Sequence, residues 1–402
     1  MNNTANKKYE IRVMSLMVFI LYFLIVIGSL NATENGLVIV GTSSLFLCLL
    51  ISSFGLLTYF FINKRLTSSQ IVILSQIFLI LLICVTSVLN NTYEMADLIN
   101  STQIILCLNL LLYLSCVGID IKRVMNINIV VIAFILFHLF VWIGSGLPNL
   151  FASIYNNSNL IGPYMFYTSF FLIVGLKYSR YKIFYALMVF FSLLLIFASD
   201  TRSIFLSVFV VLVMFLLWPL ITKTKIIAFL FFIIITVFIL MFIFVYPLLP
   251  TFQFFMPLEQ WMVTHTGKSL MSGRNDLWVP LVEMINLKPL VGYSPGTLAS
   301  EIIGTNQSPH NLYLNILMQT GYLSLLGFFI IFATIWMTLV KVKDNFIVRL
   351  TACYFIAILV HQSFEITLLQ NQLSIGLLQW FILGLGLSIA IEELHNDGIK
   401  NN

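Results

Sequence analysis

The residues best suited to chemistry in this chain are two arginines and a histidine outside its apolar segments. Arg202 occurs in ASDTRS, Arg274 in SGRNDLW and His310 in SPHNLYL. A guanidinium group presents a planar set of donors that suits phosphate oxygens. An imidazole titrates close to neutral pH, so it can take a proton from a hydroxyl group. These residue types together point to a site that holds a phosphate ester and activates a hydroxyl.

Each of the three residues also has a purely structural explanation, which the local pattern leaves open. Arg274 could pair with Asp276 or Glu283, and Arg202 with Asp200 across a turn. The histidine could simply be a polar residue at the start of a helix. However, the positive end of a helix dipole disfavours an arginine in the first turn unless an anion binds there. This favours the functional interpretation of Arg274.

Three ionisable residues lie within apolar runs, away from their ends. They are His138, His361 and Glu365. His361 and Glu365 are four residues apart, so we expect them on one face of a single helix. Ionisable groups inside a membrane are functional candidates, although a satisfied structural pair fits equally well. For His138 we expect a polar contact between helices.

The elements that must position these residues are apolar helices. Of the 402 residues, 60% belong to the hydrophobic class and 9% are charged, whereas a soluble domain carries about 25% charged residues. Apolar runs of about 20 residues recur, each long enough to cross the bilayer as a helix. We predict an all-α, polytopic membrane protein with about 12 transmembrane helices and a first helix that is retained, not cleaved as a signal peptide. These helices are expected near 12–30, 37–61, 70–89, 102–119, 128–145, 162–176, 183–199, 203–221, 226–247, 320–340, 350–368 and 372–391.

The distribution of basic residues predicts the topology. With the N-terminus in the cytoplasm, all but four of the 20 Lys and Arg residues fall on the cytoplasmic side, as the positive-inside rule requires. The four exceptions are Arg202, Lys268, Arg274 and Lys288. We therefore expect both termini in the cytoplasm and an extracytoplasmic site. The net charge of +5 then reflects topology, and we expect the lipid bilayer and no nucleic acid as a partner.

The chain divides into three parts on this topology. Residues 1–247 carry transmembrane helices 1–9, residues 248–310 form one large extracytoplasmic loop, and residues 311–402 carry helices 10–12. The other external segment of note, 146–161, contains an asparagine-rich patch that we interpret as loop. Lys268 and Lys288 in the large loop suit anchors at the level of the lipid headgroups.

Two short helices are expected at the large loop. SGRNDLWVPLVEMINLKPLVG predicts a helix capped by Ser272 and ended by Pro289 and Gly292. HNLYLNILMQTG, residues 310–321, predicts a helix that leads into the tenth crossing with a bend at Gly321.

Neither a metal nor a cofactor is expected. The five cysteines all fall inside apolar runs, as small core residues do. No DxD or ExD pair occurs in an expected external loop to hold a divalent metal. The arginines would therefore have to stabilise any phosphate charge.

The combination SGRNDLWVPLVEMINLKPLVGYSPGT … SPHNLYLNILMQTGYLSLLGFF resembles the signature of bacterial O-antigen ligases and O-antigen or capsule polymerases. In that superfamily an R-x-x-x-W helix, a P-L-x-G-x-G-like turn and an H-N-x-[YF]-L…G helix frame a large external loop, and SDTRS resembles its small-x-S-R turn. The resemblance covers about residues 199–330. Two departures are Ser294-Pro295, where a Gly-x-Gly turn is common, and Thr201 in place of the usual serine.

The resemblance implies a GT-C-like helical fold and a metal-independent, inverting glycosyltransferase. Its donor would be an oligosaccharide on undecaprenyl diphosphate, held through Arg202 and Arg274, and His310 would be the base or orient the attacking hydroxyl. We expect polymerisation of repeat units into O-antigen or capsule at the bacterial inner membrane, with a chain-length regulator and a flippase as partners. Further substrate-binding residues are expected at Asn311, Asp276, Tyr313, Lys268, Glu365 and His361.

Two other functions fit the same features. A ligase would transfer the finished glycan to a lipid or protein acceptor, and the acceptor pocket that decides this cannot be read from the sequence. A polysaccharide flippase or transporter would need charged or polar groups deep in the bundle, which this chain mostly lacks. A non-catalytic scaffold fits least well.

Overall fold

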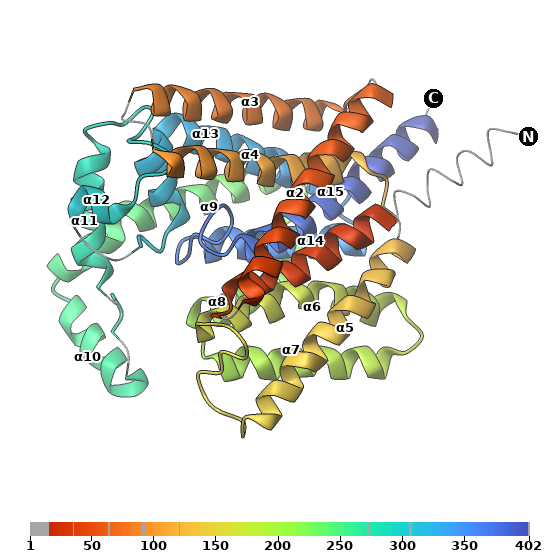
Figure 1. The fold of residues 1–402 in the computed structure, drawn as a ribbon, viewed down its shortest axis with the longest axis horizontal. Coiled ribbons are helices and arrows are strands. Elements are labelled where there is room, and N and C mark those ends of the chain that lie inside the picture. The colour runs from red at the N-terminus through yellow and green to blue at the C-terminus, as the bar shows by residue number, and fades with distance from the viewer. Residues whose placement is uncertain are drawn as a thin grey trace, which may run out of the picture.

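The computed structural model describes residues 16–34, 36–62, 65–90, 94–119, 121–267, 269–271, 273–304 and 308–400. Within these ranges every regular element is helical (Figure 1). Ten helices are long and apolar enough to span a membrane, and two shorter apolar helices occur where further crossings are expected. The twelve are Leu16–Ala32, α2 (Leu37–Ile62), α3 (Ser68–Leu89), α4 (Met95–Cys116), α5 (Ile121–Gly144), α6 (Ile161–Tyr178), α7 (Lys182–Ser199), α8 (Arg202–Ile221), α9 (Lys225–Val245), α13 (Leu312–Lys341), α14 (Phe346–His361) and α15 (Leu373–Lys400). This confirms the expected polytopic, all-helical membrane fold.

The helices differ in how much of their surface the bundle covers. In the apolar window of α15, 94% of the residues are buried, compared with 22% in the window around α9. Large apolar side chains such as Phe61, Leu216 and Phe238 are exposed on the outer helices, as expected for a surface that faces lipid. The core therefore lies around α15 and its neighbours, and α2, α8 and α9 form part of the rim.

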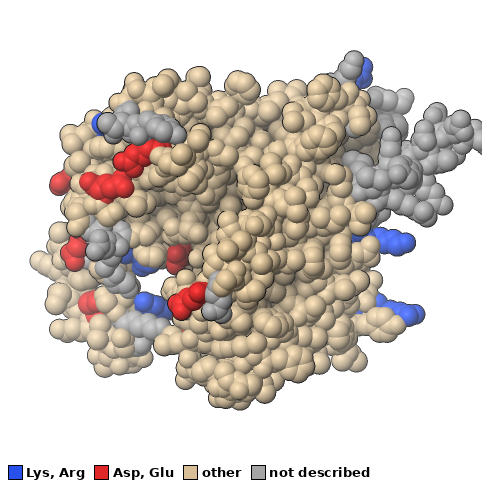
Figure 2. Space-filling view, in the orientation of Figure 1, with Lys and Arg blue, Asp and Glu red and all other residues tan. Residues whose placement is uncertain are grey.

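The two ends of the bundle carry different segments. The connections 222–224 and 342–345 lie at one end, as does the end of α15. The short helices α10 (Phe255–Thr266), α11 (Arg274–Ile285) and α12 (Ala299–Ile303) project from the other end (Figure 1). Charged side chains gather around a hollow at that second end (Figure 2). The candidate site is therefore at the end built by the connections 200–201, 246–311 and 362–372.

Two helix boundaries differ from the sequence prediction in ways that affect the site. The eleventh crossing, expected over 350–368, ends at His361, where the Gln362 carbonyl accepts a hydrogen bond of 2.9 Å from the amide of Leu312. Glu365 therefore lies in the following turn, and the expectation that it shares a helix with His361 was wrong. Because the carbonyl of the residue that ends α14 accepts from the first amide of α13, the two helix ends are held together.

The expected bend at Gly321 is a break inside α13. Gly321 has φ 72° and ψ −174°, and the Leu290 carbonyl would overlap a Cβ at this position. The amide of Tyr322 donates to the Pro289 carbonyl at 2.8 Å, and that of Tyr293 donates to the Met318 carbonyl at 2.9 Å. The segment that follows α11 thus packs into the break in α13 and supplies hydrogen-bond partners for the backbone groups of α13 that the break leaves unpaired.

The large loop carries more helix than expected. It contains the 3₁₀ helix η3 (Tyr246–Thr251), α10 and α12 in addition to α11. The α11 helix packs through one apolar face, on which Leu277, Leu281 and Ile285 are buried. The helix ends at Ile285, before the proline and glycine expected to end it. The expected cap, Ser272, lies outside the described residues, and the N-cap position is Gly273.

The unusual Ser294-Pro295 turn is fixed by a contact with another helix. The Ser294 hydroxyl donates to the carboxylate of the buried Asp97 in the first turn of α4, and the Gly296 amide donates to the same oxygen at 2.9 Å. A side chain at Gly296 would meet this carboxylate at 2.5 Å. The hydroxyl of Ser294 and the amide of Gly296 therefore share one acceptor, the Asp97 carboxylate, and this contact stabilises the Ser294-Pro295 turn.

Candidate functional site

The first cavity at this end has a volume of about 590 Å³ and contains both arginines. We name it the arginine cavity. The start of α8, the end of α9, η3 and α11 form most of its walls, and the connection after α14 completes them. Its lining residues are Leu150, Asn159, Asp200, Thr201, Arg202, Ser203, Leu206, Phe242, Tyr246, Leu270, Arg274, Phe364 and Glu365.

Arg202 enters the cavity because the chain reverses sharply before it. Asp200 adopts a left-handed conformation, φ 52°, that ends α7, and Arg202 is the first residue of α8. The hydroxyls of Ser199 and Thr201 hydrogen bond at 3.0 Å. Thr201 is buried, so the residue that replaces the usual serine keeps a hydroxyl in this turn. The sharp turn holds the arginine at the mouth of the cavity.

Arg274 is the first residue of α11 and is half-buried. Its guanidinium carbon lies 5.7 Å from the centre of the Phe364 ring. Its Nε is buried and has no hydrogen-bond partner. Both arginines thus start helices whose first amide groups lack intrahelical acceptors. Two cationic side chains and two helix N-termini make the cavity suitable for an anion.

The R-x-x-x-W spacing has a structural explanation. Trp278, one turn after Arg274, is fully buried and donates through Nε1 to the Pro309 carbonyl at 2.8 Å. Pro309 directly precedes His310. The helix that carries the arginine is therefore tied to the segment that carries the histidine.

A second cavity of about 510 Å³ adjoins the first. We name it the amide cavity, because five of its lining side chains are Asn or Gln. It forms where the segment 156–163 faces the connection between α14 and α15. Its lining residues are Glu34, Asn156, Asn157, Asn159, Leu160, Pro163, His310, Glu365, Thr367, Asn371, Gln372 and Ile375. Asn159 and Glu365 belong to both cavities, so the two meet there.

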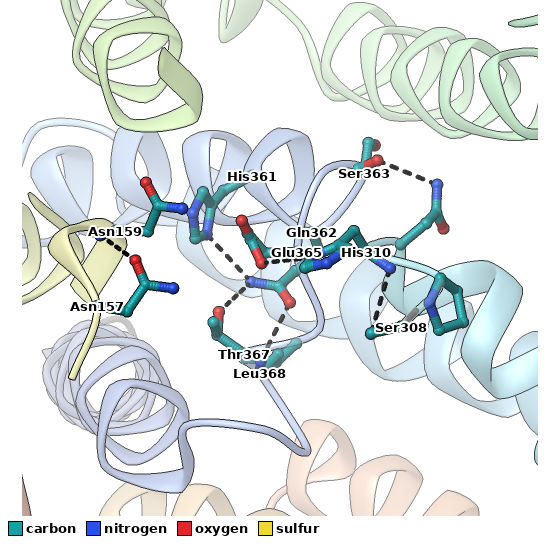
Figure 3. Close-up of polar contacts among 12 residues, drawn as sticks. Asn157, Asn159, Ser308, His310, His361, Gln362, Ser363, Glu365, Thr367 and Leu368 are labelled. Carbon is teal, nitrogen blue, oxygen red and sulfur yellow. Dashed lines mark hydrogen bonds and ion pairs between the residues drawn. The ribbon is translucent and has the colours of Figure 1, made fainter. Parts of the chain in front are cut away.

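His310 and Glu365 form a pair at this junction. His310 Nδ1 lies 3.3 Å from Glu365 Oε2, and the two side chains are 49% and 24% exposed. In Figure 3, Glu365 lies between His310 and Asn159. His310 has φ 46°, a left-handed conformation that is unfavourable for most residues with a side chain. The α13 helix begins two residues later, with Asn311 as its cap.

Three residues expected to bind substrate lie behind the cavity walls. Asn311 and Tyr313 are fully buried and donate to the carbonyls of Ser363 at 3.1 Å and Leu359 at 2.7 Å. His361 is also fully buried, with Nδ1 3.1 Å from the hydroxyl of Tyr167. These contacts suit residues that hold α13, α14 and the connection after α14 in place.

The remaining expected residues are scattered. Asp276 is exposed on α11 and is not among the residues that line either cavity. Lys268 lies outside the described residues. The Lys288 ammonium lies 4.8 Å from the centre of the Tyr293 ring. His138 makes a polar contact, with Nδ1 2.6 Å from the Ser153 hydroxyl, but Ser153 belongs to the connection after α5, so the expected contact between helices was wrong in its partner.

Sequence reasoning missed the amide cavity. The asparagine-rich patch at 156, 157 and 159 predicts only a loop, and neither Asn371 nor Gln372 is among the predicted site residues. One signal was available: the polar run QNQ at 370–372 interrupts two apolar stretches at an expected external turn. Polar residues that recur at one end of a bundle deserve comparison with each other.

The comparisons with known proteins agree with this geometry. A family model described as O-antigen ligase matches residues 187–329, a segment that includes Arg202, Arg274 and His310. Members of this family are glycosyltransferase-like membrane enzymes that act on lipid-linked polysaccharide. A search of curated proteins finds no match. The match covers residues 187–329 and supports the resemblance of this segment to O-antigen ligases and polymerases.

Proposed function

We propose that this protein polymerises oligosaccharide repeat units carried on undecaprenyl diphosphate into a surface polysaccharide. The observation that carries the proposal is the junction at Glu365. A cavity with two arginines lies on one side of this residue, and a cavity with a histidine and several amides lies on the other. Such an arrangement suits the transfer of a sugar from a diphosphate to a hydroxyl.

The arginine cavity would hold the diphosphate of the donor. Arg202 and Arg274 would pair with its oxygens, and the first amides of α8 and α11 would add further donors. The unpartnered Nε of Arg274 supports this, since a buried donor without an acceptor is costly unless a ligand supplies one. Leu206 and Phe242 line the same cavity, and they provide an apolar path for the lipid chain along α8 and α9.

The histidine would activate the acceptor. With Nδ1–H donating to Glu365, the other ring nitrogen, Nε2, is left as an acceptor for a proton. The acceptor hydroxyl would lose its proton to Nε2 as its oxygen attacks the anomeric carbon of the donor. The bond from this carbon to the diphosphate oxygen breaks, and the electron pair leaves with the lipid diphosphate. Attack opposite the leaving group inverts the anomeric centre.

The arginines would stabilise the charge that develops on the departing diphosphate. Preorganised cations and dipoles of this kind commonly supply the largest part of catalysis. No step of this reaction requires a redox change, since one bond to the anomeric carbon forms as another breaks.

The same site is proposed to lie on the extracytoplasmic face of the bacterial inner membrane. The basic residues at 177, 180, 182, 223 and 225 lie at the opposite end of the bundle from both cavities. The positive-inside rule then supports cytoplasmic termini. A chain-length regulator and a flippase are proposed as partners on the basis of the resemblance.

Ligation to a lipid or protein acceptor is the second candidate, because the matching family model is described as O-antigen ligase. A ligase would use the same arginine cavity and the same base with a different acceptor. The two functions therefore differ in the acceptor that binds beside His310.

The experiment is a surface-glycan gel of a strain that lacks the gene, with and without the wild-type gene. A single exported repeat unit in the deletion strain, and a restored ladder on complementation, would support polymerisation. A normal ladder that is no longer attached to its final acceptor would show ligation instead. Lipid-linked units trapped on the cytoplasmic side would contradict both and indicate transport.

A further inference from the structure

We propose that the amide cavity is a binding subsite for a neutral, hydroxyl-rich sugar of the acceptor, and that Asn371 and Gln372 determine which sugar it takes. This inference rests on the proposed function, because it assigns the acceptor side of the same site.

The cavity walls carry the groups that recognise sugars. Planar amides offer a donor pair and an acceptor on one side chain, so they can bond neighbouring hydroxyls of a sugar ring at the same time. Asn156, Asn157 and Asn159 contribute from one wall, and Asn371 and Gln372 from the opposite one. Leu160, Pro163 and Ile375 add apolar surface, which suits the C–H face of a ring.

Several of these amides are available for a ligand. In the described part of the chain, no hydrogen bond uses the side chain of Asn156 or Asn371. The Oε1 of Gln372 is buried and has no partner. Because native structures rarely leave a buried acceptor unpaired, this atom indicates that a donor from outside the chain completes the site. A sugar hydroxyl at the cavity wall would provide that donor.

The backbone at this wall of the cavity also has an unusual conformation. Asn371 has φ 56°, a left-handed conformation that asparagine tolerates better than most residues. Gln372 then precedes the first residue of α15, and its carbonyl accepts from the Ile375 amide at 3.0 Å. The rigid start of α15 thus holds both side chains at fixed positions beside His310 and Glu365.

The charge of the cavity argues for a neutral sugar. Its described lining includes two carboxylates, Glu34 and Glu365, and no lysine or arginine. An acidic sugar would therefore bring a carboxylate close to two others without a cation to pair with it. The two arginines lie in the neighbouring cavity, where the donor diphosphate would occupy them.

The origin of the walls supports a role in specificity. Among the lining residues of the amide cavity, His310 alone falls within the 187–329 segment that matches the family model. The arginine cavity takes most of its lining from that segment. The acceptor side is thus built mainly from parts of the chain outside the matched domain, where variation would alter the sugar and leave the chemistry unchanged.

The test measures two kinds of binding to the full-length protein in lipid nanodiscs. The first probe is the lipid-free repeat-unit oligosaccharide, released by mild acid from lipids of the deletion strain and followed by saturation-transfer NMR. The second is geranyl diphosphate, a short soluble polyprenyl diphosphate. The variants are Asn371→Gly, which suits the backbone at that position, and Gln372→Met, which removes the unpaired acceptor with little change in shape. Gln253→Met, at an exposed residue outside both cavities, is the matched control.

We expect each cavity variant to weaken oligosaccharide binding about tenfold and to leave geranyl diphosphate binding and the melting temperature unchanged. Gln253→Met should change neither. Unchanged oligosaccharide binding in both cavity variants would overturn the inference, and so would a loss that follows only from a lower melting temperature.

Two further measurements separate this inference from the proposed function. Arg274→Ala should weaken geranyl diphosphate binding and spare oligosaccharide binding; if it spares both, the diphosphate assignment fails while the sugar subsite stands. Methyl glucoside should bind more tightly than methyl glucuronide in the wild type. The opposite order would overturn the assignment to a neutral sugar.

Discussion

The arginine cavity and the amide cavity share Glu365 and Asn159 but are built in different ways. The first is formed largely by helix N-termini and aromatic side chains within the matched segment, and it concentrates positive charge. The second is formed by connections between helices, and its walls carry amides and carboxylates. A diphosphate is the same in every lipid-linked donor, whereas the acceptor sugar varies. Under the proposed function, the unvarying diphosphate would bind mainly at helix N-termini and the variable acceptor sugar mainly at the connections between helices.

The histidine offers the most severe test of this comparison, because it lies where the two cavities meet. We expect His310→Gly to lower the rate of chain extension by about 10²- to 10⁴-fold, the range for loss of a general base. Glycine suits the left-handed backbone of this position, φ 46°, so folding should be preserved. The rate is measured with purified protein and lipid-linked repeat units.

Added imidazole should restore part of the activity of His310→Gly, because it can replace the missing base. A variant that keeps full activity would show that His310 is not the base. A variant that is inactive, correctly folded and unaffected by imidazole would argue for an orienting role instead.

The arginine cavity is tested by Arg274→Ala. Removal of one cation that stabilises the leaving group should reduce the rate by about 10²-fold or more. Arg274→Lys should recover only part of this, since lysine lacks the planar fork. Lys288→Ala removes a cation from the same loop, outside both cavities, and should retain wild-type activity. Equal losses at Arg274 and Lys288 would mean that general loop charge matters, and the distinction between the cavities would fail.

Glu365, the carboxylate that lines both cavities, allows a further test of the difference between them. Glu365→Gln keeps the size of the side chain and removes its charge, and we expect kcat to fall about tenfold as His310 loses its orienting partner. KM for the lipid-linked donor should change little, because the proposed contacts to the diphosphate come from the arginines. A rise in KM with unchanged kcat would instead assign Glu365 to substrate binding, as its place on both cavity walls also allows.

The smallest effect is expected at the link between α11 and the histidine. Trp278→Phe keeps an aromatic ring but removes the donor to the Pro309 carbonyl. We expect a loss of about 1–3 kcal/mol in stability, the cost of a buried acceptor left unpaired, and a decrease in rate of less than about tenfold. Thermal unfolding in nanodiscs and the extension assay measure the two effects. Full stability with a large loss of activity would show that the bond to Pro309 matters for the position of His310 and not for the stability of the fold.

Much of the fold could be predicted from the sequence because the membrane imposes simple rules. Apolar runs such as those of α8 and α9 must form helices, and basic loops report their orientation. The same rules brought Arg202, Arg274 and His310 to one end of the bundle. Local patterns sufficed there, since Arg202 and Arg274 begin helices and His310 lies two residues before one.

The pairing of His310 with Glu365 could not be predicted, because it joins residues 55 positions apart. The periodicity of the eleventh crossing continues in apolar residues beyond His361, although the helix ends there. The helix stops because the Gln362 carbonyl accepts from the Leu312 amide of another helix, and no local signal records such a contact. Asn371 and Gln372 were missed for the same reason, since short polar connections show no periodicity.

The break at Gly321 has a consequence for the order in which the protein assembles. The amides of Tyr322 and Leu323 donate to carbonyls of Pro289 and Leu290, and lipid offers no substitute acceptor. The break therefore cannot be left facing the hydrocarbon while the chain inserts. With the site on the extracytoplasmic face, as proposed, the segment after α11 has to cross the bilayer before it can dock in this break. Because His310 lies just ahead of α13, we expect the proposed base to reach its place only after that docking.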